Sequence, residues 1–123
     1  MQNLLLVFIG GGLGSMCRYG VARFFLNMSE HKLSATASTL FSNITSSLLL
    51  IIFWVLIDLG KMSPNLKFLL IVGFCGGFST FSTFSFETFQ LLREGNITLA
   101  LLNIGLSVLL CIGAMYIAYK QLT

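Results

Sequence analysis

Long apolar runs, separated by short polar stretches, dominate this chain. The runs extend over residues 4–26, 33–57, 66–92 and 98–119. Each holds the roughly 20 mostly apolar residues that a helix needs to cross a bilayer. Most charged residues and the only proline, Pro64, lie between the runs or at their ends. The pattern predicts an all-α membrane protein with one domain, residues 1–123, built from four transmembrane helices.

Composition agrees with this prediction. Hydrophobic residues make up 56% of the chain, charged residues only 9%, and the mean hydropathy is +0.93. A soluble domain of this size needs more polar surface than that to stay dispersed. No basic residue precedes the first run and no small-x-small cleavage site follows it, so we expect the run to be a span rather than a removable signal. We expect a multi-pass protein of the cell inner (plasma) membrane, surrounded by the lipid bilayer and binding no nucleic acid.

The first run combines closely spaced glycines with a charge. Gly10 and Gly14 form a small-xxx-small pair, which lets two helix backbones approach closely in lipid. A phosphate-binding loop is not indicated, because no lysine follows the last glycine and no strand precedes the run. Arg18 lies well inside the run, where a charge is costly unless it reaches the interface or finds a partner. Both interpretations of Arg18 stay open.

Polar residues in the second run form a stripe. Thr39, Ser42, Asn43 and Ser46 recur at spacings of three and four, which places them on one face of a helix. Hydroxyls in such a stripe commonly bond to neighbouring helices. The amide of Asn43 has several donors and acceptors to satisfy, so we expect it to face a partner, water or a ligand.

The third run is interrupted by glycines. Gly73, Gly76 and Gly77 make a continuous helix unfavourable, so we predict a break at this Gly-rich point. A break at membrane depth is tolerated only where it is buried in protein or lines a cavity, and its free carbonyls can bind a small cation. Beyond it, Phe78, Phe81 and Phe84 recur every three residues, with hydroxyls between them. They either pack in a core or line a dehydrated anion pathway with their positive ring edges.

The remaining polar and sulfur-containing residues carry less information. Asn103 and Ser107 share a face of the fourth run and either extend a polar track or bond to neighbouring helices. The three cysteines lack the spacing of metal ligands, and we interpret them as small apolar fillers; they are Cys17, Cys75 and Cys111. The single histidine, His31, lies in a polar loop. No nucleophile, base and orienting group occur together, so an enzyme is not indicated.

At these motifs the chain resembles the CrcB/Fluc family of small fluoride channels. The likeness covers nearly the whole chain. It includes Gly-Gly-x-x-Gly followed by Arg-Tyr in the first run and Thr-x-x-x-Asn in the second. Its most specific part is Gly-Phe-Cys-Gly-Gly-Phe-Ser-Thr-Phe-Ser-Thr-Phe-Ser, residues 73–85. Three positions depart from the family's usual pattern without undermining the assignment: Ser38 and Ser46 stand where glycine is common, and Ser79 replaces a threonine.

The resemblance implies an antiparallel, dual-topology homodimer with fluoride pores and a buried sodium ion on its two-fold axis. Backbone carbonyls of Gly76 and Ser79 would hold the structural Na+. The implied function is passive fluoride export, which relieves fluoride toxicity. The residues implied for the fluoride pathway are Asn43, Phe81 and Phe84, with Ser82, Thr83 and Ser107 as a polar track, Glu87 as an acid near one end and Arg18 near a vestibule.

The distribution of positive charge also favours dual topology. Four spans place Lys61, Lys67 and Lys120 on one side of the membrane, and Arg23, Lys32 and Arg93 on the other, with Arg18 left inside. Because the two sides are balanced, the positive-inside bias that normally fixes orientation vanishes. We therefore expect insertion in both orientations.

Two rival functions remain. A small multidrug-resistance-type exporter is also a short four-helix dimer, but it needs a carboxylate in its first helix, and residues 4–26 contain neither Asp nor Glu. A non-transporting accessory protein is not excluded, although scaffolding gives no reason for a hydroxyl-rich interruption. Transport rate, halide selectivity, gating and the protonation state of Glu87 do not follow from the sequence.

Overall fold

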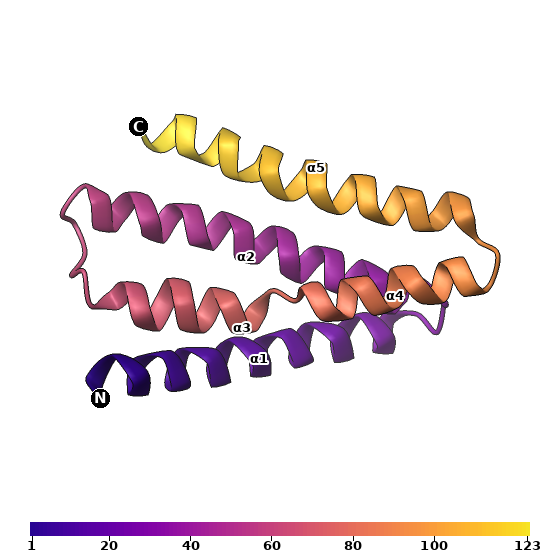
Figure 1. Ribbon diagram of the computed structural model, residues 1–123, viewed down its shortest axis with the longest axis horizontal. Helices are drawn as coiled ribbons and strands as arrows, with labels where there is room; N and C mark the ends of the chain where they lie inside the picture. Colours follow the sequence, from indigo (N-terminus) through magenta and orange to yellow (C-terminus); the bar gives the residue numbers. More distant parts are fainter.

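The computed structural model describes all residues, 1–123, and is entirely helical (Figure 1). Its elements are α1 (Gln2–Met28), α2 (Ser34–Asp58), η1 (Lys67–Cys75), α3 (Gly76–Phe78), α4 (Phe81–Arg93) and α5 (Ile97–Leu122). Taken together, η1, α3 and α4 form the third span, Lys67–Arg93. Four segments are therefore long and apolar enough to cross a membrane. This confirms the predicted all-helical membrane architecture.

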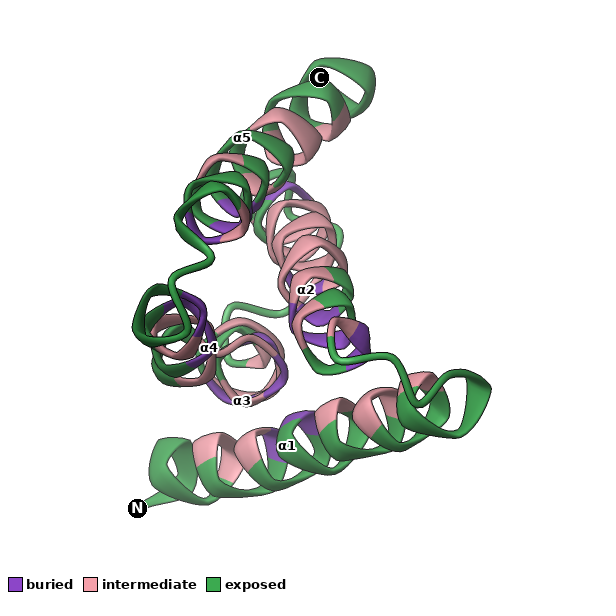
Figure 2. Cartoon of the chain, turned by 90° about the vertical axis from the view of Figure 1, so that its right-hand side faces the viewer, coloured by how far each residue is buried: buried purple, intermediate pink, exposed green.

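The four spans lie in three layers, and spans that follow each other in the sequence run in opposite directions, so that α1 is parallel to the third span and α2 is parallel to α5. The helix α2 and the third span form the middle layer, with α1 on one side of it and α5 on the other (Figures 1 and 2). Both chain termini and the loop between α2 and η1 lie at one end of the molecule, and the other two loops lie at the opposite end (Figure 1). Successive spans thus cross the membrane in alternating directions.

Two helices end in the same glycine-dependent turn. After α2, Gly60 adopts a φ of 69°, and after α4, Gly95 adopts a φ of 79°. In each turn the amide two residues past the C-cap donates back across the last helical turn, from Lys61 to the Leu56 carbonyl and from Asn96 to the Leu91 carbonyl, both at 2.9 Å. A positive φ is readily available only to glycine, which explains why each helix stops where it does.

The interior of the molecule is more polar than apolar. Only five hydrophobic residues are buried, against nine polar or charged ones. Three members of the predicted stripe of α2, Thr39, Ser42 and Ser46, are buried together with Ser38, whereas the fourth member, Asn43, is half-buried. Lipid is as apolar as a leucine side chain, so membrane helices associate through close packing and hydrogen bonds rather than by burying apolar surface. The large hydrophobic side chains accordingly cover the outside.

Glycines let α1 and the third span come into backbone contact. A Cβ added at Gly14 would lie 2.8 Å from the Phe78 amide nitrogen, and one added at Gly73 would lie 2.9 Å from the Cα of Gly10. A Cβ at Gly77 would clash with the Gly11 carbonyl. Any larger residue at these positions would force the two helices apart. The predicted role of the small-xxx-small pair in packing is therefore what the structure shows.

The third span is interrupted, but not at its glycines. Gly73, Gly76 and Gly77 all lie within helical segments, and the extended residues are Ser79 (φ −79°, ψ 159°) and Thr80 (φ −154°, ψ 117°). The expectation of a break at the Gly-rich point is corrected in this respect. Two of the glycines are used for contact with α1, whereas the interruption falls where side-chain partners can satisfy the freed backbone groups.

Candidate functional site

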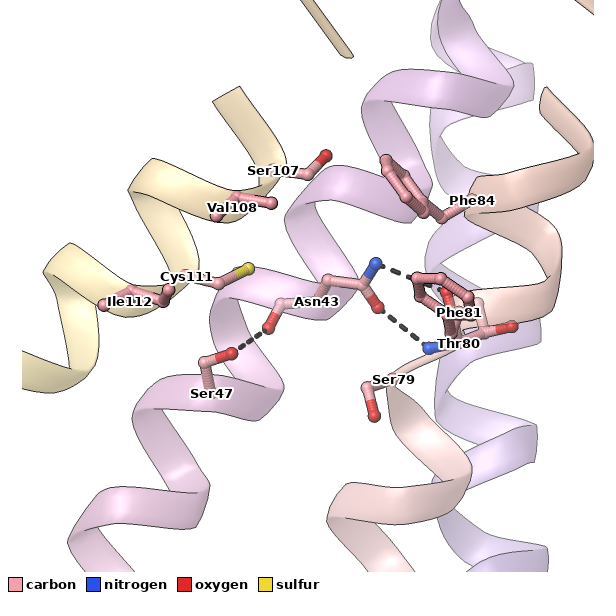
Figure 3. A pocket seen from close by; sticks show the side chains of 10 residues that line it. All are labelled: Asn43, Ser47, Ser79, Thr80, Phe81, Phe84, Ser107, Val108, Cys111 and Ile112. Carbon is pink, nitrogen blue, oxygen red and sulfur yellow. Dashed lines mark hydrogen bonds between the residues drawn. The ribbon is translucent and has the colours of Figure 1, made fainter. Parts of the chain in front are cut away.

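A pocket of about 320 Å³ opens beside the interruption, between α2 and α5 (Figure 3). The interruption and the first turn of α4 form one wall, and the polar face of α2 forms another. None of the ten lining residues is charged. They are Asn43, Ser47, Ser79, Thr80, Phe81, Phe84, Ser107, Val108, Cys111 and Ile112. The site therefore offers hydroxyl, amide and aromatic groups without a fixed charge.

Asn43 of α2 forms two hydrogen bonds with the interruption. Its Oδ1 accepts a hydrogen bond from the Thr80 amide at 2.8 Å, and its Nδ2 donates a longer one to the Thr80 carbonyl at 3.4 Å (Figure 3). The first bond satisfies an amide that the interrupted helix leaves without a helical partner. The side-chain amide carries two N–H groups and uses one of them here. Asn43 thus positions the interruption and keeps a donor at the pocket.

Hydroxyl groups bond to the backbone on both sides of the interruption. The Cys75 carbonyl, which accepts the last helical bond from the Ser79 amide at 3.0 Å, also accepts from Ser46 Oγ at 2.8 Å and from Ser79 Oγ at 2.9 Å. On the far side, Thr80 is the N-cap of α4, and its Oγ1 accepts from the Thr83 amide at 3.2 Å. Threonine suits this second position because its short hydroxyl replaces a helical partner that the Thr83 amide lacks.

The two phenylalanines of the first turn of α4 lie against each other at the pocket. The ring centroids of Phe81 and Phe84 are 5.7 Å apart, with the ring planes inclined by 42°. Phe84 is half-buried, but Phe81 is 80% exposed. A ring this exposed is not a core-packing residue of the single chain. Both rings are available to something in the pocket or to a second protein surface.

Ser107 of α5 faces the same pocket without a partner. Its side chain is 8% exposed, and its Oγ makes no hydrogen bond. An unpaired hydroxyl is unfavourable in a low-dielectric interior. The sequence left two interpretations for Ser107, extending a polar track or bonding to a neighbouring helix. The structure shows no such bond to a neighbouring helix. Its hydroxyl therefore has no partner within the chain.

Asn103 behaves differently from Ser107. Its Nδ2 donates to Thr88 Oγ1 at 2.9 Å, and Thr88 Oγ1 donates to the Phe84 carbonyl at 2.8 Å. Asn103 is buried and does not line the pocket. For this residue the structure therefore favours bonding between helices, since the chain of hydrogen bonds ties α5 to the turn of α4 that carries Phe84.

Glu87 is buried between α2 and α4, away from the main pocket. Its Oε1 accepts a hydrogen bond from Thr39 Oγ1 at 2.8 Å, while its Oε2 has no partner. Thr39 and Asn43 are four residues apart on α2, so they share a face of that helix. Glu87 therefore packs against the polar face of α2 that also carries Asn43, toward the end of the molecule with the first and third loops.

Arg18 bonds within the protein. Its Nε donates to the Gly77 carbonyl at 3.2 Å, and the residue is half-buried. Of the two interpretations left open by the sequence, finding a partner is therefore the one that the structure shows. The carbonyl that accepts this bond belongs to Gly77, two residues before the interruption, and Arg18 does not line the pocket. Its charge is close to the site but is not part of the lining.

The other predicted residues lie around the interruption. The hydroxyl oxygens of Ser82 and Thr83 are 3.3 and 3.1 Å from Thr80 Oγ1, so both belong to the hydroxyl cluster at the start of α4 and not to the lining of the pocket. Gly76 is exposed, and no atom lies within 4 Å of the position that a Cβ would occupy. Ser79 is half-buried.

Several residues of the site were not singled out from the sequence. Thr80 was seen only as one hydroxyl among several, and Ser46 only as part of the stripe on α2. Cys111 was interpreted as a filler, yet its thiol lines the pocket (Figure 3). Its spacing of four from Ser107 was a usable signal, because residues four apart share a helix face.

The fold and the site together define a small multi-pass membrane protein with an uncharged pocket, lined by both polar and hydrophobic residues, at an interrupted helix. Residues 5–119 match the family described as "CrcB-like protein, Camphor Resistance (CrcB)". The chain belongs to this family. It is 42% identical to the "Fluoride-specific ion channel FluC" of Coxiella burnetii (strain CbuK_Q154), over 94% of each chain.

Relatives from distant organisms carry the same name. The "Fluoride-specific ion channel FluC" of Leptospira interrogans is 43% identical over 91% of this chain and 87% of its own. That of Pyrococcus horikoshii is 39% identical over 94% of this chain and 92% of its own. The likeness therefore extends over the whole transmembrane region and is not confined to one motif.

Proposed function

We propose that this chain is a fluoride-selective channel that allows passive fluoride export and so lowers cytoplasmic fluoride toxicity. The relatives' names support this function, and so does one feature of the site. An uncharged pocket holds an amide N–H of Asn43 and the hydroxyl of Ser107, neither of which is used within the chain, beside the rings of Phe81 and Phe84. These groups can donate to an anion without trapping it.

The chemistry of fluoride explains why such a site is needed. Fluoride holds its water strongly, so a selective pathway has to replace that water with closely spaced donors. A fixed Lys or Arg would bind the ion too tightly, since conduction requires sites that the ion can leave. Aromatic ring edges carry partial positive charge and add a weaker attraction. Asn43, Ser107, Phe81 and Phe84 supply these two kinds of group, with Ser82, Thr83, Glu87 and Arg18 as more distant members of the pathway.

The working unit that we propose is an antiparallel homodimer of dual topology in the cell inner (plasma) membrane. The 80% exposed ring of Phe81 and the half-buried Ser79 both line the uncharged pocket, together with the polar side chains of Asn43 and Ser47. Polar groups and irregular backbone are unfavourable against lipid and need protein or water in front of them. A second copy of the chain, inverted in the membrane, would supply that cover without requiring a separate partner.

A structural sodium ion at the dimer axis is part of this proposal. The carbonyls of Gly76 and Ser79 would hold it, and hard oxygen ligands suit a hard cation. Gly76 has open space beside it, and Ser79 lies in the extended stretch outside the helices. The ion would stabilise the assembly of the two subunits. Because only backbone is used, Ser79→Ala should leave the sodium dependence of the dimer's melting temperature unchanged; loss of that dependence would contradict the assignment.

The decisive experiment is anion efflux from liposomes that contain the purified protein. We expect rapid fluoride efflux and little chloride efflux, with empty liposomes as the control. Equal rates for both anions would contradict fluoride selectivity, and no flux of either would favour the non-transporting accessory protein. The proton-coupled exporter is not supported, because the chain belongs to the CrcB family and α1 contains no Asp or Glu. The function proposed is that of a channel and not of an enzyme.

A further inference from the structure

A second, smaller pocket lies at the end of the molecule where the first and third loops meet. It has a volume of about 60 Å³, which is room for one or two water molecules. Residues from the start of α2 and from the second half of α4 line it. They are Lys32, Leu33, Ala35, Thr36, Glu87, Gln90, Leu91 and Glu94. This pocket, which we call the loop-end pocket, is separate from the main pocket.

The loop-end pocket connects the outside of the protein to a buried carboxyl group. Lys32 and Glu94 are exposed, whereas Glu87 is 8% exposed and its Oε2 has no partner. The other oxygen of Glu87 accepts from Thr39, which is one helical turn from Asn43 in the main pocket. The loop-end pocket therefore leads toward the face of α2 on which the proposed fluoride pathway lies.

The rim of this pocket carries a pair of opposite charges. The Lys32 ammonium forms an ion pair with the Glu94 carboxylate, joining the first loop to the third. The two side chains are 61% and 34% exposed. An ion pair this exposed contributes little to stability. Its charges still act on a small ion that approaches the pocket, because low-dielectric walls focus the field of nearby charges.

We propose that the loop-end pocket is an outer mouth of the fluoride pathway and that Lys32 raises the local fluoride concentration there, while Glu94 moderates this attraction. The inference rests on the proposed function. Lys32 lies outside the main pocket, so its charge attracts the anion without creating a trap along the conducting path. In this arrangement the charge of Lys32 attracts the anion at the mouth, and the neutral donors of the main pocket conduct it.

The test compares two substitutions that remove the same ion pair. In liposomes at low ionic strength and low fluoride, we expect Lys32→Gln to lower initial fluoride efflux by about threefold and Glu94→Gln to raise it by about twofold. At roughly 0.3 M of an impermeant salt, both effects should shrink, because screening shortens the reach of exposed charges to a few ångströms. A purely structural ion pair predicts changes of the same sign for both variants, since both lose the same contact.

Two further variants test whether the effect comes from charges at the pocket or from any charge at this end of the molecule. Arg93→Gln and Glu30→Gln change the net charge by the same amounts, at positions close in sequence but outside the lining of the pocket. We expect each to change efflux by less than half as much as its partner at the pocket. Same-sign changes, no change, or controls as strong as Lys32→Gln and Glu94→Gln would each overturn this inference alone. Absence of fluoride efflux from the unmodified protein would overturn the proposed function and, with it, the inference.

Discussion

Asn43 combines two tasks in one side chain. Its oxygen accepts from the Thr80 amide, which fixes the interruption of the third span, while its amide nitrogen retains an N–H group at the pocket. An aspartate could perform the first task but not the second, and a leucine could perform neither. The residue can therefore be dissected by substitution, which separates its structural role from its contribution to fluoride passage.

We expect Asn43→Asp to reduce fluoride flux by at least about tenfold, equivalent to roughly 1.4 kcal/mol in a barrier. The change replaces a donor with an acceptor or a like charge, yet it preserves the bond to Thr80, so the melting temperature in detergent should remain near that of the unmodified protein. Asn43→Leu should lose flux and also lower the melting temperature, because it leaves the Thr80 amide unpaired at a cost of about 1–3 kcal/mol. Normal flux in Asn43→Asp would show that the amide does not serve the ion.

The aromatic rings can be tested with a control from the same helix. We expect Phe81→Ile and Phe84→Ile each to lower fluoride flux by at least about tenfold, because isoleucine retains apolar volume but has no positive ring edge. Phe89→Ile should leave flux nearly unchanged, since Phe89 lies on α4 outside the lining of the pocket. Flux from proteoliposomes measures all three. Equal losses in all three variants would indicate that the phenylalanines serve packing rather than conduction.

At the scale of elements, two kinds of residue have separate roles in the third span. Glycines provide the surface on which α1 packs, and the hydroxyl-bearing residues that follow provide the interruption. Ser46 and Asn43 of α2 hold the two sides of the interruption through Cys75 and Thr80. The site is thus positioned by α2, and α1 holds the half of the third span that precedes it.

The packing role of the glycines gives a prediction about stability. Gly14→Ala should lower the melting temperature markedly, because the new Cβ would press on the backbone of the third span, and overpacking of this kind costs about 1–3 kcal/mol. Gly12→Ala on the same helix is the matched control. No atom lies within 4 Å of its added Cβ, so that variant should be neutral or slightly more stable. A Gly14→Ala protein as stable as Gly12→Ala would mean that α1 does not pack as the structure has it.

On the scale of the whole molecule, charge balance and shape point to the same assembly. The structure places the loop containing Lys61 at one end, with both termini, and the loop containing Lys32 at the other (Figure 1). The positive charges that could fix orientation are therefore equal in number at the two ends. A dimer of inverted copies requires this balance, since each copy has to insert in the opposite sense.

Dual topology can be checked by labelling. In a chain whose three cysteines are replaced, a single cysteine added after Thr123 should react with a membrane-impermeant reagent in about half of the molecules in sealed vesicles. Lys61→Gln combined with Lys67→Gln should shift the labelled fraction and reduce fluoride flux, because it leaves one orientation in excess. Coexpression with the double variant Arg23→Gln/Arg93→Gln, which biases the orientation in the opposite sense, should restore flux. Labelling of every molecule, or of none, in the unbiased chain would exclude the antiparallel dimer.

The sequence by itself determined the four spans and the family. Hydropathy is a local property, because it depends on neighbouring residues along one helix. The glycine-dependent turns after α2 and α4 are local as well, but their glycines were not singled out from the sequence. The polar stripe of α2 was evident, since a helix presents every third or fourth residue on one face. Which residues would gather at the pocket also followed in part, through the motif shared with the family.

Tertiary structure alone decided which groups partner one another. Asn43 meets Thr80 across 37 residues of sequence, Thr39 meets Glu87 across 48, and Arg18 meets Gly77 across 59. No periodicity encodes such pairs, because they depend on how the helices rotate and slide when they pack. The same packing placed the glycines against α1 and the interruption at Ser79 and Thr80. A broken helix in a membrane can persist only where partners from another helix satisfy its backbone, and that position is fixed by the packed fold.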